Sequence, residues 1–213
     1  MKDTKERILL ASLELFARYG YDAASVSRIA EAVGLTKGAL YRHFEDKAAI
    51  LRAILARMEA DDAAFAGRFA LPMGEAPDSS TERAPSGGTL DFSAERDADA
   101  AALVAFARAM FAYWTEDAFA SAFRRMLTVS QYTSPEMRAL YRQYLADEPL
   151  AYCEDILKAA GHADARLKAL RLFAPMTFLY ALYDGEADHA ETLRLADAHF
   201  SSMARELCSG FTV

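Results

Sequence analysis

The side chains with the most readable chemistry lie in residues 25–44, a run that reads as a helix, a tight turn and a second helix. Gly34 can supply the positive φ that the turn needs, and Ala30 is small where two crossing helices must approach. Thr36 and Lys37 open the second helix. Such a helix can lie in the major groove of DNA, with its first residues against base edges and its flanks against phosphates. The run therefore predicts a DNA-reading unit.

Four helices would position this unit. The first begins at Asp3 or Thr4, because Glu6 completes capping-box spacing after Asp3, and it ends at Gly20. The second follows Ser25 as N-cap, the third runs from the Thr36 cap through His43, and the fourth begins after Asp46. The shared core would take the apolar residues at helical spacing, which are Ile8, Leu9, Leu13, Phe16, Tyr19, Val26, Ile29, Ala30, Val33, Leu35, Leu40 and Phe44.

The rest of the chain also has helical periodicity, and no alternating β-branched stretch of useful length occurs, so an all-α protein is predicted. We expect a helix-turn-helix domain over residues 1–46 and a helical effector-binding and dimerisation domain over 47–213. A connecting helix would span 47–70, and the Pro-, Gly- and Ser-rich stretch 71–93 would be a flexible loop. Later helices begin near Ala94 and after Ser134-Pro135, and the last two run over about 164–183 and 189–208.

The last two helices differ from the others in their apolar pattern. The penultimate helix is apolar almost all round, and the final helix has a seam with steps of three, four, three and four through Leu193, Ala196, Phe200, Met203 and Leu207. Two such helices would suit a two-fold four-helix bundle, so a homodimer through them is predicted. The alternative is that both helices complete the core of a monomer.

The charge is divided unevenly between the two parts of the chain. The net charge of −7 argues against nonspecific binding to nucleic acid, but residues 1–58 hold ten Lys and Arg against seven Asp and Glu. A mildly basic N-terminal part, the head, thus precedes an acidic C-terminal part, the body.

Cys153 and Cys208 are too few for a disulfide scaffold, so reduced thiols are expected. No apolar run approaches the roughly 20 residues of a membrane span, and no signal sequence is evident, so we expect a cytoplasmic protein without a membrane partner.

Between Ile8 and Lys47 the sequence resembles the TetR family of bacterial transcriptional regulators. The matching motifs are Ile8-Leu-x-Ala-x-x-x-Leu15-Phe, Gly20-Tyr-x-x-x-Ser25-Val-x-x-Ile-Ala and Gly34-Leu-Thr-Lys-Gly-Ala-Leu-Tyr-x-His-Phe44, followed by Asp46-Lys47. The chain departs from the family at Ala24, where many members have Thr, which removes one hydroxyl that could cap or contact phosphate. Beyond residue 58 the resemblance is one of helix order only.

The resemblance implies a set of DNA contacts. Thr36, Lys37, Gly38 and Ala39 would face the groove, Tyr41, His43 and Lys47 would meet phosphates, Ser25 and Arg28 would flank them, and Arg42 would help to read bases. Other interpretations stay open, since Ser25 and Thr36 can act as caps alone, Arg28 as a solvated charge and Tyr41 as core.

We expect the Lys47→Ala change to lower the salt dependence of DNA binding, measured as the slope of log affinity against log salt concentration, by about one unit. A dimer would select an inverted-repeat operator of double-stranded DNA, with half-sites about one helical turn, or a multiple of it, apart.

The resemblance also implies that the C-terminal helices enclose a small-molecule effector whose binding moves the heads. We predict a largely apolar or aromatic effector, because the body is rich in aromatic and Met side chains that adapt to varied ligands. If only charged inducers were found, Arg124 and Arg125 would be the anion-binding candidates. The predicted pocket residues, each of which could instead be core, are Phe106, Met110, Trp114, Phe123, Met126, Tyr132, Tyr141, Phe173, Met176 and Tyr180.

An enzyme is the main competing class, but the sequence lacks its usual signatures. No HExxH motif, GxSxG elbow or phosphate-binding glycine loop occurs, and the acidic residues look like solvated helix faces. Asp184, Asp188 and His189 could form a metal site only by chance, so no cofactor is predicted. A constitutive DNA-binding protein without an effector is a second alternative, and the sequence does not separate repressor from activator.

Overall fold

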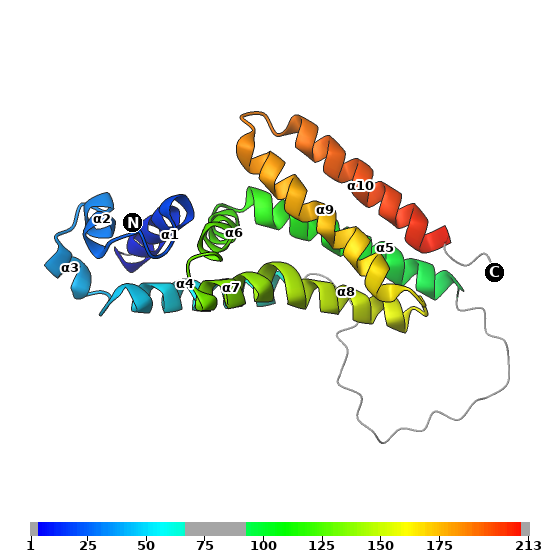
Figure 1. Cartoon of the computed structure of the whole chain (residues 1–213), viewed down its shortest axis with the longest axis horizontal. Coiled ribbons are helices and arrows are strands. Elements are labelled where there is room, and N and C mark those ends of the chain that lie inside the picture. The colour runs from blue at the N-terminus through cyan, green and yellow to red at the C-terminus, as the bar shows by residue number, and fades with distance from the viewer. Residues whose placement is uncertain (1–3, 67–92, 210–213) are drawn as a thin grey trace, which may run out of the picture. The chain divides into compact units, whose positions relative to one another are not determined.

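The computed structural model describes residues 4–66 and 93–209, and every regular element within these ranges is helical (Figure 1). The prediction of an all-α fold is therefore confirmed. The loop predicted over 71–93 and the end of the connecting helix beyond Ala66 lie outside the described residues, apart from Ser93, which begins a helix.

The first four helices follow the predicted order. They are α1 (Thr4–Tyr19), α2 (Val26–Ala32), α3 (Lys37–Tyr41) and α4 (Lys47–Ala66). Ser25 and Thr36 are N-caps as predicted, and the carboxylate of Asp46 accepts a hydrogen bond from the Ala49 amide at 2.6 Å. α3 ends at Tyr41, two residues earlier than predicted, because the backbone tightens into a turn in which the His43 amide bonds the Leu40 carbonyl.

The later helices are α5 (Ser93–Glu116), α6 (Ala118–Ser130), α7 (Pro135–Arg142), α8 (Glu148–Ala159), α9 (Ala165–Gly185) and α10 (Ala190–Ser209). A π-helix, η1 (Gln143–Asp147), joins α7 to α8 and was not predicted. Pro149 is the second residue of α8, which follows η1 directly, so its missing N–H coincides with the change from π-helical to α-helical hydrogen bonding.

The chain divides into two compact units. Unit 1 contains α1 to α4, the end of α5 from Phe111, and α6, α7 and η1, whereas unit 2 contains α5 up to Met110, most of α8, and α9 and α10. The cuts fall inside α5 and α8. The functional boundary predicted after residue 46 is a different division and stays a prediction.

The core of unit 1 forms where α1 packs on α6, α2 and α4. Its fully buried side chains include Ile8, Leu13, Phe16, Ile29, Leu40, Ile50, Ile54, Met58, Phe123 and Met126. Tyr19, which we expected to be buried with them, is 36% exposed, because the last turn of α1 passes the edge of this core. The first unit thus holds the predicted helix-turn-helix on a scaffold that includes two helices from the middle of the chain.

In unit 2, α9 and α10 lie side by side (Figure 1). Four residues of the predicted α10 seam, Ala196, Phe200, Met203 and Leu207, are buried within the chain, whereas Leu193 is 40% exposed. The seam therefore contributes to the core of a single chain, and a second copy would need another surface.

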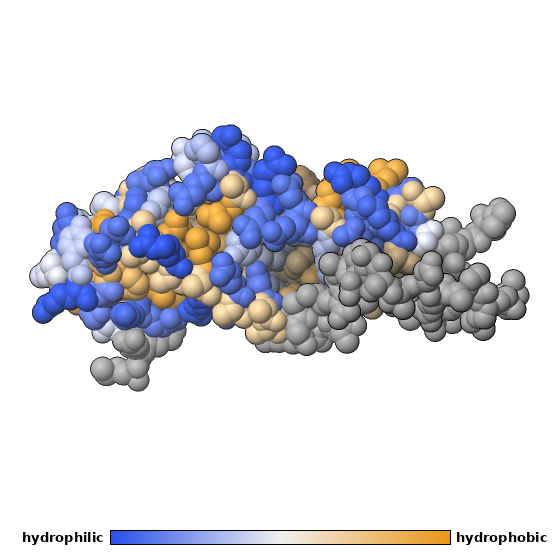
Figure 2. Space-filling model, turned by 90° about the horizontal axis from the view of Figure 1, so that it is seen from below, coloured by the Kyte–Doolittle hydropathy of each residue, from blue (hydrophilic) through white to orange (hydrophobic). Residues whose placement is uncertain are grey.

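Figure 2 shows that hydrophobic residues also reach the molecular surface as patches among hydrophilic ones. The large exposed hydrophobic residues are Tyr19, Tyr41, Val129, Tyr132, Leu167, Leu170, Phe178, Leu193 and Leu195.

Burial raises the pKa of the Cys153 thiol well above its ordinary value. Within the described ranges, no helix has the length and apolarity required to span a bilayer.

Candidate nucleic-acid interface

The turn between α2 and α3 is built by local hydrogen bonds. Gly34 takes a φ of +71°, and the Leu35 amide returns to the Ala30 carbonyl at 2.8 Å. The Ser25 hydroxyl oxygen accepts from the Arg28 amide at 3.3 Å, and the Thr36 hydroxyl oxygen accepts from the Ala39 amide at 3.1 Å. Both hydroxyls act as caps through a lone pair, which leaves each O–H free to donate to a phosphate.

α3 presents a polar face and a single buried anchor. Lys37, Gly38 and Tyr41 are exposed, while Leu40 is completely buried. A Cβ placed on Gly38 would meet no atom within 4 Å, so the helix surface is open at that point. The Lys37 ammonium lies 5.8 Å from the centre of the Tyr41 ring. The exposed face of α3 therefore has room for a larger side chain or a ligand at Gly38.

The other residues predicted to contact DNA, at the end of α3 and just after it, differ in their exposure. Arg42 is exposed, whereas Ala39 and His43 are half-buried. Ala39 can therefore offer a methyl surface to a base, and Arg42 is the long cation at the end of this helix.

A second group of cations surrounds Tyr19 at the end of α1. The Arg28 guanidinium lies 4.2 Å from the centre of the Tyr19 ring, and Arg18 lies 5.2 Å from the same ring. Arg28 is thus an exposed cation that a ring holds in place. The sequence interpretation missed Arg18 and Tyr19 because Tyr19 fits the apolar spacing of α1, and only its exposure reveals the cluster.

Lys47 is bound within unit 1. Its ammonium donates to the carbonyls of Tyr21 at 2.8 Å and Asp22 at 3.2 Å, and it lies 4.3 Å from the centre of the Tyr21 ring. Burial is the main reason that the pKa of Tyr21 is raised. Two of the three N–H groups of Lys47 are occupied, so one remains for a phosphate, and the predicted contact of Lys47 with DNA stays a prediction.

We expect the Lys47→Ala change to lower the free energy of unfolding by about 1–2 kcal/mol, because two carbonyls lose a charged donor. Urea unfolding followed by circular dichroism would measure the change, with Lys5→Ala, an exposed lysine of α1, as the control. Unchanged stability together with a reduced salt slope of DNA binding would show that Lys47 serves the duplex alone.

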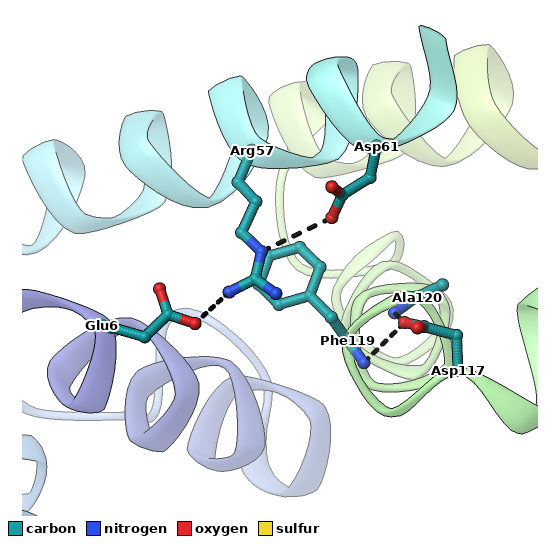
Figure 3. Close-up of polar contacts among 6 residues, drawn as sticks. All are labelled: Glu6, Arg57, Asp61, Asp117, Phe119 and Ala120. Atoms are coloured by element: carbon teal, nitrogen blue, oxygen red, sulfur yellow. Dashed lines mark hydrogen bonds and ion pairs between the residues drawn. The ribbon is translucent and has the colours of Figure 1, made fainter. Parts of the chain in front are cut away.

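Arg57 of α4 ties together three helices of unit 1 (Figure 3). Its guanidinium pairs with Glu6 of α1 and, at 3.4 Å, with Asp61 one turn along α4. The same guanidinium lies 4.0 Å from the centre of the Phe119 ring, at the start of α6. Asp117 caps α6 there by accepting from the amides of Phe119 and Ala120 at 2.9 Å each. A displacement of α4 or α6 would therefore change the contacts of Arg57 with α1.

A second link joins the loop after α1 to the end of α6. The Tyr21 amide donates to the Ser130 hydroxyl at 3.0 Å, and a Cβ on Gly20 would lie 3.6 Å from Val129. Gly20 has a φ of +82°, which an L side chain rarely adopts. The predicted DNA-reading helices are therefore attached to α6 at both ends of α1.

The predicted effector residues fall into both units. Trp114, Phe123 and Met126 are buried in unit 1, where Tyr141 is half-buried and Tyr132 is 80% exposed. Phe106 and Met176 are buried in unit 2, where Met110, Phe173 and Tyr180 are half-buried. Tyr132 thus does not line an interior in this conformation, and the pocket assignment of the other nine residues stays a prediction.

The polar groups that we considered as alternative sites are engaged in local structure. Arg124, the possible anion site, is buried and donates from Nε to the Trp114 carbonyl at 3.0 Å. Asp188 accepts from the Ala190 amide, and the His189 ring stacks on Tyr183 with ring centres 3.8 Å apart. Among the described residues, no three His, Cys, Asp or Glu side chains are grouped so that they could hold a metal ion.

Comparison with known proteins places the helix-turn-helix in a family. Residues 8–54 match the model of the bacterial regulatory proteins of the tetR family. The chain is 44% identical over 55 residues to the uncharacterized HTH-type transcriptional regulator TtgW of Pseudomonas putida, a match covering 26% of this chain and 41% of that protein. It is 39% identical over 67 residues to the HTH-type transcriptional repressor Rv1474c of Mycobacterium tuberculosis, covering 32% and 36%. The chain thus matches less than half the length of these relatives.

Solved structures extend the similarity of fold along the chain. MexZ, described as a key repressor responsible for antibiotic resistance in Pseudomonas aeruginosa, superposes with a TM-score of 0.58 at 17% identity, covering 95% of this chain and 96% of MexZ. FadR from Bacillus subtilis, solved in complex with stearoyl-CoA, gives a TM-score of 0.57 at 18% identity, covering 97% and 98%. At these identities the likeness shows the fold alone. Residues 8–54 are therefore similar in sequence to the N-terminal domain of the bacterial regulatory proteins of the tetR family, and the solved structures extend only the similarity of fold beyond them.

Proposed function

We propose that the protein is a sequence-specific DNA-binding transcriptional regulator, a repressor that a small effector releases from its operator. The observation that carries this proposal is the capped, exposed face of α3, held by the buried Leu40 and by Gly34 in the turn before it. The relatives named as HTH-type transcriptional regulators and repressors support the same assignment. Because DNA lies in the bacterial cytoplasm, the proposal implies a cytoplasmic protein.

The proposed DNA contacts are divided between base reading and phosphate binding. Thr36 and Lys37 would read base edges, and the bare surface at Gly38 would allow close approach of the duplex. Cations on the flanks would set the orientation of the head on the phosphates. The residues assigned to this interface are Ser25, Arg28, Thr36, Lys37, Gly38, Ala39, Tyr41, Arg42, His43 and Lys47.

We further propose that the regulator is a homodimer through α9 and α10. Leu167, Leu170 and Phe178 of α9 are 55%, 46% and 67% exposed. Their offsets of three and eleven residues place them on one face of the helix. Apolar side chains that are exposed on a single chain and aligned in this way are typical of a surface that a second copy covers. Two heads would then read an inverted-repeat operator.

Selection of binding sites from random duplex DNA tests the proposed function. We expect an inverted repeat whose half-sites lie about one helical turn or a multiple apart, because two related heads must reach the same face of the duplex. A selection that returned no enriched sequence from intact, folded protein, with and without candidate small molecules, would refute sequence-specific regulation.

Lys37→Ala is the sharpest single test of the interface. We expect it to weaken binding to the selected operator by about tenfold, because one base or phosphate contact is worth roughly 1–3 kcal/mol. The free energy of unfolding should stay within about 0.5 kcal/mol of wild type, since Lys37 is exposed. Arg138→Ala, an exposed cation of α7, is the matched control and should leave affinity unchanged. Equal losses for both variants would reduce Lys37 to a general charge effect.

The proposed effector is a small molecule with a largely apolar body. Support comes from the aromatic and Met side chains of the helices after α4, and the B. subtilis FadR neighbour was itself solved with a bound acyl-CoA. An effector would release the operator if it bound the conformation that does not bind DNA more tightly. Thermal-shift screening distinguishes this regulator from a constitutive DNA-binding protein, for which no small molecule should raise the melting temperature. Catalysis has no part in the proposal.

A further inference from the structure

Aromatic rings in unit 1 form a continuous cluster that joins α4, α5, α6 and η1. The ring of Phe65 stacks on Tyr113 with centres 4.8 Å apart, and Tyr113 lies 5.5 Å from Trp114. Trp114 stacks near Phe123 at 6.3 Å, and Phe123 meets Tyr144 edge to face at 5.1 Å. We call these five residues the ring cluster. Tyr144 lies in the π-helix η1, an element that is rare and often found at functional sites.

A carboxylate stands beside the ring cluster without a counter-charge. Asp62 lies three residues before Phe65, so both side chains share one face of α4. Asp62 is half-buried, and no cation or hydrogen-bond donor among the described residues pairs with it. Burial is the main reason that the pKa of Asp62 is raised to about 6. The negative charges of Asp61 and Glu148 contribute to the same shift. Burial is the main reason that the pKa values of Tyr113 and Tyr144 are raised, and the negative charge of Asp62 adds to both shifts.

Tyr113 carries a second unsatisfied group at the same place. Its hydroxyl is inaccessible to water and has no hydrogen-bond partner within the described part of the chain. An orphaned buried hydroxyl normally destabilises a fold by about 1–3 kcal/mol, so its retention calls for an explanation. The local cation that could help, Arg57, is already paired with Glu6 and Asp61.

We propose that the ring cluster and Asp62 bind an organic cation with an aromatic or hydrocarbon body, and that this cation is the effector. A half-buried carboxylate without a partner is stabilised when a cation binds, and ring faces attract the same charge. The apolar body of such a ligand would pack on the half-buried rings of Phe65, Tyr113 and Tyr144, as in other small-molecule sites. The inference rests on the proposed function for the role of the ligand, although binding itself does not require DNA.

The geometry also supplies a route from the ligand to the head. Asp61 stands next to Asp62 in α4 and holds Arg57, whose other carboxylate partner is Glu6 in α1. A cation bound between Asp61 and Asp62 competes with Arg57 for Asp61. Occupancy would therefore change how Arg57 is shared between Asp61 and Glu6, and the Arg57–Glu6 pair is the contact that connects α4 to α1.

Two ions of the same shape and opposite charge test the proposal. Tetraphenylphosphonium is an aromatic cation, and tetraphenylborate is its anionic counterpart. Calorimetry on the full-length protein, together with the fluorescence of Trp114, the only tryptophan in the chain, reports binding at the ring cluster. We expect the phosphonium to bind one site per chain and the borate to bind at least about tenfold more weakly. Equal binding of the two ions, or binding of neither, overturns the proposal.

Variants locate the charge. Asp62→Asn should weaken phosphonium binding by at least about tenfold, and Tyr113→Leu should weaken it by removing a ring face. Glu136→Gln, which removes an exposed carboxylate of α7, is the matched control and should leave binding unchanged. An unaffected Asp62→Asn variant would refute the assignment. If Asp62→Asn lost its helical circular dichroism, the conservative Asp62→Glu variant would decide, because it retains the charge and should retain binding.

The pH dependence gives an independent readout. The titratable groups that interact electrostatically with Asp62 are Asp61 on α4, Tyr113 on α5, Tyr144 in η1 and Glu148 at the start of α8. Its carboxyl is ionised above its pKa of about 6, so phosphonium affinity should fall as the pH is lowered from 7.5 to 5. Asp62→Asn should show no such fall, and an identical fall in both proteins would refute the role of Asp62.

A DNA experiment separates failure of this inference from failure of the proposed function. Phosphonium should release wild-type protein, but not Asp62→Asn, from the selected operator. If the protein binds its operator but not phosphonium, the cation site is refuted and the regulator remains. If phosphonium binds but no duplex does, the site remains and the regulator is refuted.

Discussion

Asp in place of Phe178 is expected to turn a dimer into a monomer and to weaken operator binding by about 100-fold or more. The side chain is 67% exposed on the single chain, so the change removes little from its core. In a dimer it would bury an unpaired carboxylate in an apolar contact. Operator binding would then lose the avidity of two linked heads, which is worth about 10²–10⁴ in affinity. Light scattering coupled to gel filtration measures the mass, and a fluorescence titration measures the affinity.

Ala151→Asp is the control for this experiment. Ala151 is exposed on α8, in the same unit, and an added acid in the first turns of a helix is tolerated there. It should leave both mass and affinity unchanged. A Phe178→Asp protein that stays dimeric and binds the operator normally would show that the exposed face of α9 is not the dimer surface.

The Leu40→Ala change is expected to lower the free energy of unfolding by about 2–5 kcal/mol, the range for a buried leucine that leaves a cavity. Leu40 is completely buried, and it is the anchor of α3, which has only five residues. Too short to be stable alone, this helix depends on its packing. Operator binding should therefore be lost together with stability. Urea unfolding of wild type and variant, with the operator titration in parallel, measures both effects.

Leu40→Met is the control for the loss of side-chain volume at this position. Because the two side chains have similar volume, the substitution should lower stability by less than about 1.5 kcal/mol and retain DNA binding. If Leu40→Ala unfolded at the same urea concentration as wild type, α3 would be held by contacts other than its buried leucine. Lys37→Ala, which should lose affinity without losing stability, provides the contrasting pattern.

Local signals made the head predictable from sequence. Ser25, Thr36 and Asp46 are N-caps whose hydrogen bonds reach only three residues ahead, and Gly20 and Gly34 adopt the positive φ values expected of their turns. Each of these features depends on neighbouring residues alone. Periodicity and capping therefore give the order of the helices and the starts of α2, α3 and α7.

Features that depend on distant residues were not predictable. Lys47 meets carbonyls about 25 residues away, and Arg57 meets a carboxylate 51 residues away. Nothing in the local sequence marks Asp62 apart from its neighbours, so the acidic residues of α4 looked like a solvated face. The structure shows that this carboxylate is half-buried and lies near Tyr113 of α5, a residue about 50 positions later in the sequence. Helical spacing also does not say which neighbour covers a face, and Ala196, Phe200, Met203 and Leu207 of α10 are buried within the single chain.

Gly38 has a consequence for how regulators of this type can diverge. The position is exposed, its backbone is ordinary for a helix, and a larger side chain would meet none of the chain's described atoms within 4 Å. Substitutions there leave the hydrophobic anchor on the opposite side of α3 untouched. With α3 as the proposed DNA-reading helix, recognition of a new operator would then be acquired one residue at a time, without a compensating change in the fold.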